Sequence, residues 1–498
     1  MKAGHIGGLR NTFTVISLRA IAAGISYKEQ NSVRIGVPLA WSFDKLDCMK
    51  VVWRVLAALA LATEAITFAV YLHVQMGSNG NLWLETIATI AFVVGLAALR
   101  GVGLRPAQLA TLIVIGGALL QIVALTRSPQ TSDDDYRYIW DGKVQLSGTD
   151  PYRYTPASPA LSSLRAAPIF GPGGPCTYAI PGTCTAINRP TVHTIYPPVA
   201  EAAFTAVRLL SFGGHGVQLP FQIAAAIGVC LISLLLARRA LGRGDPVWLV
   251  AVWAWCPVVV YEFGNNAHID WLAVLLVLLG LNAYAAGHLK RTAVLIGAAI
   301  ATKLYPGLVL ASLLRRRPWL MLGSALGLVA LTYVPHVAAV GSSVIGYLPG
   351  YLHEEGYSSG DRLLLLGAVF PHPFDTIVGI VIVGAVGLWA LRRADPNRPA
   401  DSAVIVMGVA LLVATPHYGW YAALMLALIV VSKRIEWLPV AMASSFAYLN
   451  HLAPTDESIY VIAAVLTLLG LLIRYWQFVT TLFGATARDH APELLPRP

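Results

Sequence analysis

The residues best suited to chemistry form one acidic segment, SDDDYRYIWDG, at residues 132–142. It gathers four carboxylates and an arginine, although only 12% of the 498 residues are charged. Ser132 or Asp133 is expected to cap a helix, and a helix from Asp134 would bring Arg137 or Tyr138 and then Asp141 to one face. Ile139 and Val144 would then face lipid. Because a positioned carboxylate can accept a proton from an alcohol, the segment is the best candidate for a catalytic site. The alternative is an ordinary helix cap with solvated acids.

A second polar group interrupts an apolar region in the sequence YEFGNNAHIDW, residues 261–271. Ionisable groups at membrane depth cost about 2.5–3.5 kcal/mol on insertion scales, so they usually have a function. Glu262, His268 and Asp270 together therefore predict part of a site. The alternative is a polar turn in which Asp270 or Asn266 caps the following helix.

Two further positions are candidates for substrate contact. Lys303 lies between apolar half-helices, where an ammonium group needs an anion such as a phosphate. Snorkelling of its side chain to the membrane surface is the alternative. Arg137, Arg153 and Arg189 are weaker candidates for phosphate contact. The segment TPHYGWY, residues 415–421, is either an aromatic membrane-interface belt or a cradle for a sugar or isoprenoid.

Composition identifies the elements that must hold these residues in place. The chain is 57% hydrophobic, whereas soluble domains average about 45–50% apolar and about 25% charged residues. It is therefore predicted to be an all-α polytopic membrane protein with about 12–14 transmembrane helices. Its net charge of +10 fits short basic cytoplasmic loops better than nucleic-acid binding. The apolar runs are centred on residues 51–75, 82–99, 107–126, 218–237, 246–263, 269–287, 318–339, 374–391, 402–415, 418–432, 436–450 and 457–475.

Lys and Arg residues fall in alternate loops, which orients the chain with a cytoplasmic N-terminus. Two conditions must hold for this orientation. Residues 198–212 must form an interfacial helix that does not cross, and residues 291–315 must form a hairpin of two short helices with Lys303 near its tip. A continuous helix over residues 291–315 is the alternative. Every candidate site then lies outside the cytoplasm, and residues 127–197 form a large extracytoplasmic loop carrying interfacial helices.

The predicted organisation has three parts. Residues 1–50 are a cytoplasmic N-terminal extension, and residues 1–48 lie outside the native protein if Met49 is the start. Residues 51–478 form the transmembrane domain, and residues 479–498 form a cytoplasmic tail. Within the outer loop, Cys176 and Cys184 are either a disulfide, as an oxidising compartment allows, or two free thiols.

These residues together resemble the GT-C superfamily of membrane glycosyltransferases, and most closely the polyprenol-phosphate-mannose-dependent mannosyltransferases. The resemblance covers roughly residues 50–475. Departures are Thr149-Asp150 in place of an Ile-Asn pair, a Gly- and Pro-rich insert with two cysteines at residues 171–184, and His417-Tyr418-Gly419 in place of a more proline-rich turn. The motifs that carry the resemblance are DD and YRY at 133–138, WDG at 140–142, GTDPYRY at 148–154, Pro156, YPP at 196–198, Glu262 with His268 and Asp270, Lys303 with Pro306, and residues 416–421.

The resemblance implies an inverting glycosyltransferase that moves a sugar, here mannose, from a polyprenyl-phosphate donor to a glycan or lipid acceptor. It implies an outer-loop aspartate as the general base, for which we expect Asp134 and then Asp133. Arg137 and Asp141 would orient the base. Lys303 and Arg153 would bind the donor phosphate. The substrate pocket would contain Glu262, His268, Asp270, His417 and Trp420.

The resemblance also implies that no cofactor or metal is required, although the three consecutive aspartates could bind a divalent ion. The expected partners are the lipid-linked sugar, a glycan or glycolipid acceptor and the bilayer, with no nucleic acid. The expected location is a bacterial inner or plasma membrane, with the active site on its extracytoplasmic side. The main alternative is a transporter or lipid-linked-sugar flippase, although transporters usually show repeated halves, and none is visible here. A non-catalytic assembly or polysaccharide-export partner is a third possibility.

Overall fold

The computed structural model describes residues 40–74, 79–171, 173–211, 218–449 and 456–489. The chain divides into two compact units, residues 1–48 and 49–498. Most of the predicted N-terminal extension, residues 1–39, lies outside the described residues. So do residues 490–498 of the predicted tail, whereas the last helix continues to Asp489.

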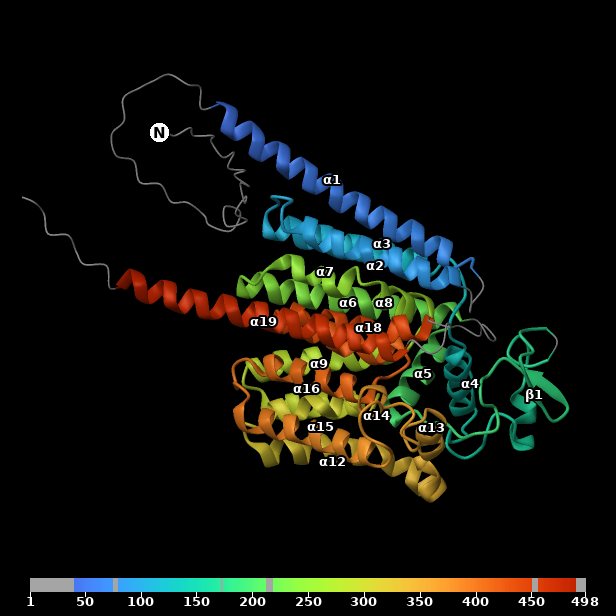
Figure 1. The fold of residues 1–498 in the computed structure, drawn as a ribbon. Coiled ribbons are helices and arrows are strands. Elements are labelled where there is room, and N and C mark those ends of the chain that lie inside the picture. The colour runs from blue at the N-terminus through green and yellow to red at the C-terminus, as the bar shows by residue number, and fades with distance from the viewer. Residues whose placement is uncertain (1–39, 75–78, 172, 212–217, 450–455, 490–498) are drawn as a thin grey trace, which may run out of the picture. The chain divides into compact units, whose positions relative to one another are not determined.

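Residues 49–498 form an all-α polytopic membrane protein, in which long apolar helices lie side by side (Figure 1). Seven of the described helices are long and apolar enough to cross a membrane, and a pair bent by 46° at residues 247–265 makes an eighth. Three shorter apolar helices, at Asp270–Ala285, Pro399–Ala414 and Gly419–Ser432, bring the total among the described residues to at most eleven, which is below the predicted 12–14. The seven are α1 (Ala40–Tyr71), α2 (Asn79–Leu99), α3 (Pro106–Ala124), α6 (Leu219–Arg243), α12 (Pro318–Val340), α15 (Phe374–Arg393) and α19 (Asp456–Asp489).

The shorter helices fill the interior of the bundle. One of them, α17, is apolar except for Ser432 and is buried along nearly its whole length, so it contributes much of the core. Because these helices end early, polar loops can enter the bundle at one end. They are α7 (Ala251–Ala254), α8 (Pro257–Val259), α9 (Asp270–Ala285), α16 (Pro399–Ala414), α17 (Ala423–Ser432) and α18 (Leu438–Leu449).

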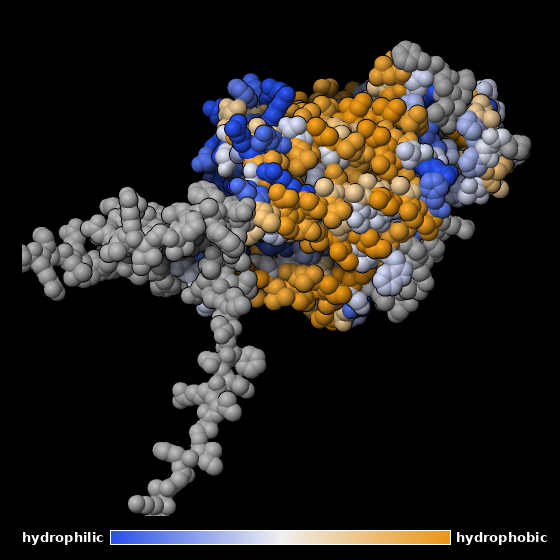
Figure 2. Space-filling model, turned by 90° about the horizontal axis from the view of Figure 1, so that it is seen from above, coloured by the Kyte–Doolittle hydropathy of each residue, from blue (hydrophilic) through white to orange (hydrophobic). Residues whose placement is uncertain are grey.

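The outward faces of the long helices are covered with apolar side chains. Leu331 of α12, Ile380 of α15 and Ile473 of α19 are 65%, 68% and 59% exposed. Figure 2 shows the result as a broad hydrophobic surface with hydrophilic residues gathered toward its ends. Such a surface would be unfavourable in water and matches the hydrocarbon core of a bilayer.

The region around Lys303 is broken into short helices, as predicted. Helix α10 (Leu289–Ile300) is followed by a 3₁₀ turn at Tyr305–Val309 and by α11 (Leu310–Leu313). Because α10 packs along both α9 and α12, the chain turns back at this point and does not cross as one helix. The continuous-helix alternative is therefore wrong, and the break leaves Lys303 in the interior of the bundle.

The predicted outer loop, residues 127–197, packs with α5 around a small hydrophobic core of its own. Helices α4 (Asp134–Leu146) and α5 (Pro198–Leu210) pack together, with the rings of Tyr138 and Phe204 stacked at 4.3 Å. At 13 residues, α5 is too short to span a bilayer, in agreement with the prediction that it does not cross. The expectation that Ile139 and Val144 face lipid is wrong, because both are buried in this core.

The same loop carries a β-hairpin of two strands, β1 (Tyr178–Ile180) and β2 (Thr183–Thr185). A disulfide joins Cys176 to Cys184, with Cα atoms 5.2 Å apart. Of the two states left open by the sequence, the structure shows the bonded one. The remaining segment of the outer surface, between α12 and α15, contains α13 (Leu348–Glu354) and α14 (Leu364–Gly367).

Basic residues gather at the end of the bundle opposite α4 and α5. Arg315 donates to the backbone oxygen of Arg392, and Arg316 donates to Asn397 at 2.8 Å. At this same end, Arg474 donates to Glu436 at 3.4 Å. These contacts join basic loops that the charge pattern assigned to one side of the membrane, which supports the predicted alternation.

Where helices pack closely, replacing a glycine by alanine is predicted to lower the stability of the protein. A Cβ atom on Gly117 of α3 would lie 2.6 Å from the backbone oxygen of Ala254, whereas one on Gly323 of α12 would contact nothing within 4 Å. Gly117→Ala is therefore expected to destabilise the protein by about 1–3 kcal/mol through overpacking. Gly323→Ala is the control and should be neutral or stabilising. Thermal unfolding in detergent measures both, and equal effects would contradict this packing.

Candidate active site

A cavity of about 640 Å³ lies at the end of the bundle that carries α4, α5 and the β-hairpin. Its wall is formed by the outer loop, by the break after α10, by α13 and by the segment that leads into α17. Several of the predicted site residues therefore meet in one place. The lining includes Ser132, Asp133, Asp134, Tyr136, Arg137, Tyr178, Asn188, Arg189, Tyr196, Lys303, Tyr351, Glu354, Tyr418, Trp420, Tyr421 and Tyr448.

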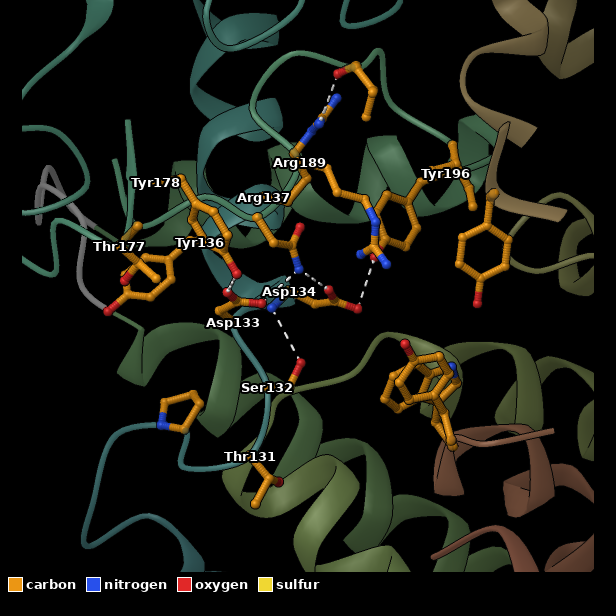
Figure 3. Close-up of a pocket in the computed structure, with 18 of the residues that line it drawn as sticks. Thr131, Ser132, Asp133, Asp134, Tyr136, Arg137, Thr177, Tyr178, Arg189 and Tyr196 are labelled. Atoms are coloured by element: carbon orange, nitrogen blue, oxygen red, sulfur yellow. Dashed lines mark hydrogen bonds between the residues drawn. The ribbon is translucent and has the colours of Figure 1, made fainter. Parts of the chain in front are cut away.

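The two neighbouring carboxylates at the start of α4 have different partners (Figure 3). The side-chain amide of Asn188 donates to Asp133 Oδ1 at 2.6 Å and to Asp134 Oδ1 at 2.7 Å. The second oxygen of Asp133 accepts a hydrogen bond from the Tyr178 hydroxyl at 2.9 Å. The second oxygen of Asp134 has only a longer contact, 3.3 Å from the Tyr196 hydroxyl. Asp133 is thus held at both oxygens, while Asp134 keeps one oxygen available to a ligand.

The protonation of Asp133 reflects this crowding. Burial raises the pKa of Asp133, and the negative charge of Asp134 raises it further. Hydrogen bonds from Tyr178 and Asn188 act in the opposite direction. Two adjacent carboxylates do not ionise independently, and the Asp134 charge favours a proton on Asp133.

A buried histidine supports the acidic segment from behind. His268 lies with Nδ1 2.9 Å from a Glu262 carboxylate oxygen and with Nε2 3.1 Å from the Ser132 hydroxyl. Its Nε2 is 3.8 Å from Asp134 Oδ2. Burial alone would lower the pKa of His268, but Glu262 and then the charges of Asp134 and Asp270 raise it above its ordinary value. The surrounding carboxylates therefore favour protonation of the imidazole, and a protonated ring places a positive charge beside the Asp134 carboxyl group.

Two asparagines fix the backbone that leads into this segment. A π-helical turn at Val260–Asn265 ends the bent helix pair, and such turns are frequent at functional sites. Asn265 accepts a hydrogen bond from the amide of Gln130, and Asn266 donates to the Thr131 hydroxyl at 2.7 Å. The polar turn at residues 261–271 therefore has a positioning role as well as supplying Glu262 and His268.

The cation at the other side of the cavity is Lys303. Its Nζ lies 3.6 Å from a carboxylate oxygen of Asp270 and 5.0 Å from the ring centre of Tyr196. The 3.6 Å separation is longer than a hydrogen bond, so the ammonium group keeps donors for a ligand. Since the Tyr196 hydroxyl contacts Asp134, one tyrosine contacts both the acid and the lysine.

The Asp141 carboxylate holds Arg137 in place from behind the cavity wall. Its Nε donates to both oxygens of Asp141, at 3.0 and 2.8 Å, in a buried ion pair. Beside this pair, Glu201 accepts hydrogen bonds from Thr194 and Gln145 at 2.7 and 2.9 Å. Burial, together with the charge of Asp141, raises the pKa of Glu201. Because a protonated Glu201 carries no charge, the positive charge of Arg137 is balanced by Asp141 alone. This ion pair fixes the guanidinium group of Arg137 at the cavity wall.

An ion pair and a group of aromatic rings complete the wall. Arg189 contacts Glu354 of α13 at 2.7 Å and so joins the outer loop to the segment between α12 and α15. The rings of Tyr418 and Trp420 stack at 4.3 Å, and Trp420 lies 4.1 Å from the ring of His268. Stacked aromatic rings with hydroxyl groups at their edges suit contact with the face of a sugar. This arrangement favours the cradle over the membrane-interface belt for residues 415–421.

The predicted site residues do not all line the cavity. Asp133, Asp134, Arg137, Lys303 and Trp420 do line it. Glu262, His268, Asp270 and Asp141 lie directly behind the wall through the contacts described above.

Two of the predicted residues have other contacts. Arg153 donates to the backbone oxygen of Ala339 at 2.9 Å, and His417 lies 3.3 Å from Asp456. Neither is among the lining residues. Their proposed roles in phosphate binding and in the substrate pocket therefore have no direct support from this geometry.

Several lining residues were not singled out as site residues from sequence. Asn188, Tyr178 and Glu354 carry no local motif, because their partners lie far away along the chain. Tyr196 was recognised only as part of a Tyr-Pro-Pro motif, and Arg189 only as a weak phosphate candidate. The positive φ of 47° at Arg189 marks a strained position, but backbone angles are not visible in a sequence.

Asp135, the third consecutive aspartate, does not share the cavity with its neighbours. Its side chain is fully buried on another face of α4. Among the described residues, no group of three or more His, Cys, Asp or Glu side chains is arranged to hold a metal ion.

The fold and the cavity define an all-α polytopic membrane protein with an acidic, aromatic site at one end of its bundle. The model of glycosyltransferase family 87 matches residues 194–416, which is less than half of the chain. This match indicates a membrane glycosyltransferase. The matched region includes Tyr196, Glu262, His268, Asp270 and Lys303. No curated protein and no solved structure gives a significant match.

The burial of Asp135 predicts a pH-dependent stability. Burial raises the pKa of Asp135 to about 8, and the charges of Asp133 and Asp134 add to this effect, while Gln218 opposes it. The pKa of an aspartate in the unfolded chain is about 3.9. At pH values between this and the folded pKa, Asp135 is protonated in the folded state and ionised in the unfolded state. Rising pH therefore lowers the free energy of unfolding by at most about 1.4 kcal/mol per pH unit.

Asp135→Asn should remove this contribution, so the variant should lose less stability than the wild type between pH 5 and pH 8. Thermal unfolding across this pH range measures the difference. Glu457→Gln, at an exposed position on α19, is the matched control and should follow the wild type. Parallel pH profiles for wild type and Asp135→Asn would show that Asp135 is not protonated in the folded protein.

Proposed function

We propose that this protein is an inverting glycosyltransferase that transfers a sugar from a polyprenyl-phosphate donor to a hydroxyl of a glycan or glycolipid. The observation that carries the proposal is the pairing of Asp134 and Lys303 across one cavity, with Tyr196 in contact with both. A base and a cation in one polar cavity suit a displacement in which a hydroxyl loses a proton while a phosphate departs.

Asp134 acts as the general base. Its loosely held Oδ2 accepts the proton of the incoming hydroxyl as the hydroxyl oxygen bonds to the anomeric carbon. Such positioned proton transfer is typically worth 10²–10⁴-fold in rate. Asn188 fixes the other oxygen at 2.7 Å, so the carboxylate is oriented before the acceptor binds.

Lys303 stabilises the leaving phosphate. As the bond between the anomeric carbon and the phosphate oxygen breaks, that oxygen takes the electron pair and its negative charge grows. A fixed ammonium group in a water-poor cavity stabilises this charge more strongly than bulk water does. Arg137 and Arg189 also line the cavity and supply further positive charge. One displacement inverts the anomeric carbon, so a β-linked donor gives an α-linked product.

The sugar is placed against the aromatic wall of Tyr418 and Trp420. The resemblance to polyprenol-phosphate-mannose-dependent enzymes favours mannose. The disulfide in the outer loop and the basic loops at the opposite end support an extracytoplasmic location of the site in a bacterial inner or plasma membrane.

Asp134→Asn should reduce transfer by at least about 10²-fold, because the amide cannot take up the proton. The assay uses the purified full chain in detergent with polyprenyl-phosphate mannose and a glycolipid acceptor. Asp361→Asn is the control, since Asp361 is an exposed acid of the outer surface whose contact is Ser359. Retention of full activity by Asp134→Asn would remove this residue from the mechanism.

The same assay separates an enzyme from a transporter or flippase. An enzyme forms a glycosylated product without a second compartment. If the wild type forms no product in detergent but moves the labelled lipid-linked sugar across proteoliposomes, the proposed function is wrong. An assembly partner would show neither activity, and alanine substitutions in the acidic segment would be tolerated in complementation.

Lys303→Met should lower kcat/KM for the phosphate-linked donor by about 10²–10³-fold, because the leaving phosphate loses a preorganised cation. Lys290→Met is the matched control, since Lys290 is an exposed lysine at the start of α10 and does not line the cavity. Steady-state kinetics with varied donor concentration measure the effect. Equal activity of the two variants would mean that Lys303 does not contact the donor.

A further inference from the structure

A second cavity lies at the opposite end of the bundle from the active site. Its volume is about 390 Å³. It forms where α6, α9 and α17 end and where α16 begins, so it is built entirely from helix termini and short loops. The lining residues are Arg239, Arg243, Asp245, Leu281, Ala285, Asn397, Arg398, Pro399, Ala400, Asp401, Val431 and Lys433.

The charges around this cavity do not cancel. Lys433 pairs with Asp245 at 2.7 Å, and Arg398 pairs with Asp401 at 2.8 Å. These two pairs use both lining carboxylates. Arg239 and Arg243 therefore remain as surplus cations in the lining.

These two arginines lie one helical turn apart on α6 and so repel one another. Arg239 donates to the neutral amide oxygen of Asn282 at 2.5 Å, a contact that leaves its charge uncompensated. Its Nε atom is buried and has no hydrogen-bond partner within the described part of the chain. A buried guanidinium donor without an acceptor costs free energy, which an anion in the cavity would recover.

The position of the cavity indicates which kind of anion would fit it. Leu281, Ala285 and Val431 give it an apolar side. Trp319 at the start of α12 is 83% exposed, and Trp389 near the end of α15 is 42% exposed. Exposed tryptophans at helix ends mark the boundary between membrane and water. A cavity at this boundary, apolar on one side and cationic on the other, fits an amphiphile better than a freely dissolved ion.

We propose that this cavity binds the phosphate headgroup of an anionic phospholipid, with Arg239 and Arg243 as its principal donors. Basic pockets between transmembrane helices are the expected recognition sites for such headgroups. The site is separate from the proposed reaction and does not depend on the identity of the sugar donor.

The experiment compares full-length protein in detergent with added phosphatidylglycerol or phosphatidylcholine. Native mass spectrometry counts the bound lipids, and thermal unfolding reports the stabilisation. The wild type should retain phosphatidylglycerol preferentially and unfold at a temperature several degrees higher than with phosphatidylcholine. Arg243→Gln should lose most of this difference, and Arg239→Gln provides a second, independent variant.

Arg238→Gln is the matched control, because Arg238 is the exposed neighbour of Arg239 on α6 and does not line the cavity. It should behave as the wild type. Equal losses for Arg238→Gln and Arg243→Gln would show only general attraction to a basic surface and would overturn the proposal. A further arm adds inorganic phosphate without anionic lipid, and full protection by phosphate alone would overturn the assignment to a lipid.

Discussion

The candidate active site depends on how two adjacent carboxylates share one cavity. Side by side, Asp133 and Asp134 repel each other, and each loses hydration on burial. The two carboxylates have different hydrogen-bond partners, which reduces this repulsion. Tyr178 and Asn188 satisfy both oxygens of Asp133, while burial and the charge of Asp134 favour its protonation. Asp134 shares Asn188 and lies 3.8 Å from His268 Nε2. The rest of the fold places these hydrogen-bond donors next to the carboxylate oxygens of Asp133 and Asp134.

Those donors come from distant parts of the chain. The β-hairpin carries Tyr178, and its disulfide restricts the geometry of the loop that leads to Asn188. The turn between the bent helix pair and α9 supplies His268, while its two asparagines hold the backbone before Ser132. The break after α10 supplies the lysine. Each of these elements is short or irregular where it meets the cavity. A regular spanning helix in the same place would leave no space for the polar backbone and side chains that line the cavity.

The sequence predicted the class of fold, because apolar runs and the alternation of basic loops are local signals. It also predicted the short-helix break around Lys303, since basic residues flank that stretch on both sides. The acidic segment, Lys303 and Trp420 were found as lining residues through their unusual composition. Asn188, Tyr178 and the Arg189–Glu354 pair could not be found in this way, because tertiary contacts alone give them their roles. The predictions for Ile139 and Val144 failed because the outer loop has a hydrophobic core of its own.

The cavity is lined by residues from Pro129 to Tyr448, so segments far apart in the chain contribute to it. During synthesis, the acidic segment leaves the ribosome long before Lys303, and Tyr448 follows later still. A partly inserted chain therefore contains the acidic segment without Lys303 and without the aromatic wall. Under the proposed function, transfer can begin only after α18 has been inserted and packed, so half-built copies of the protein would not consume the sugar donor.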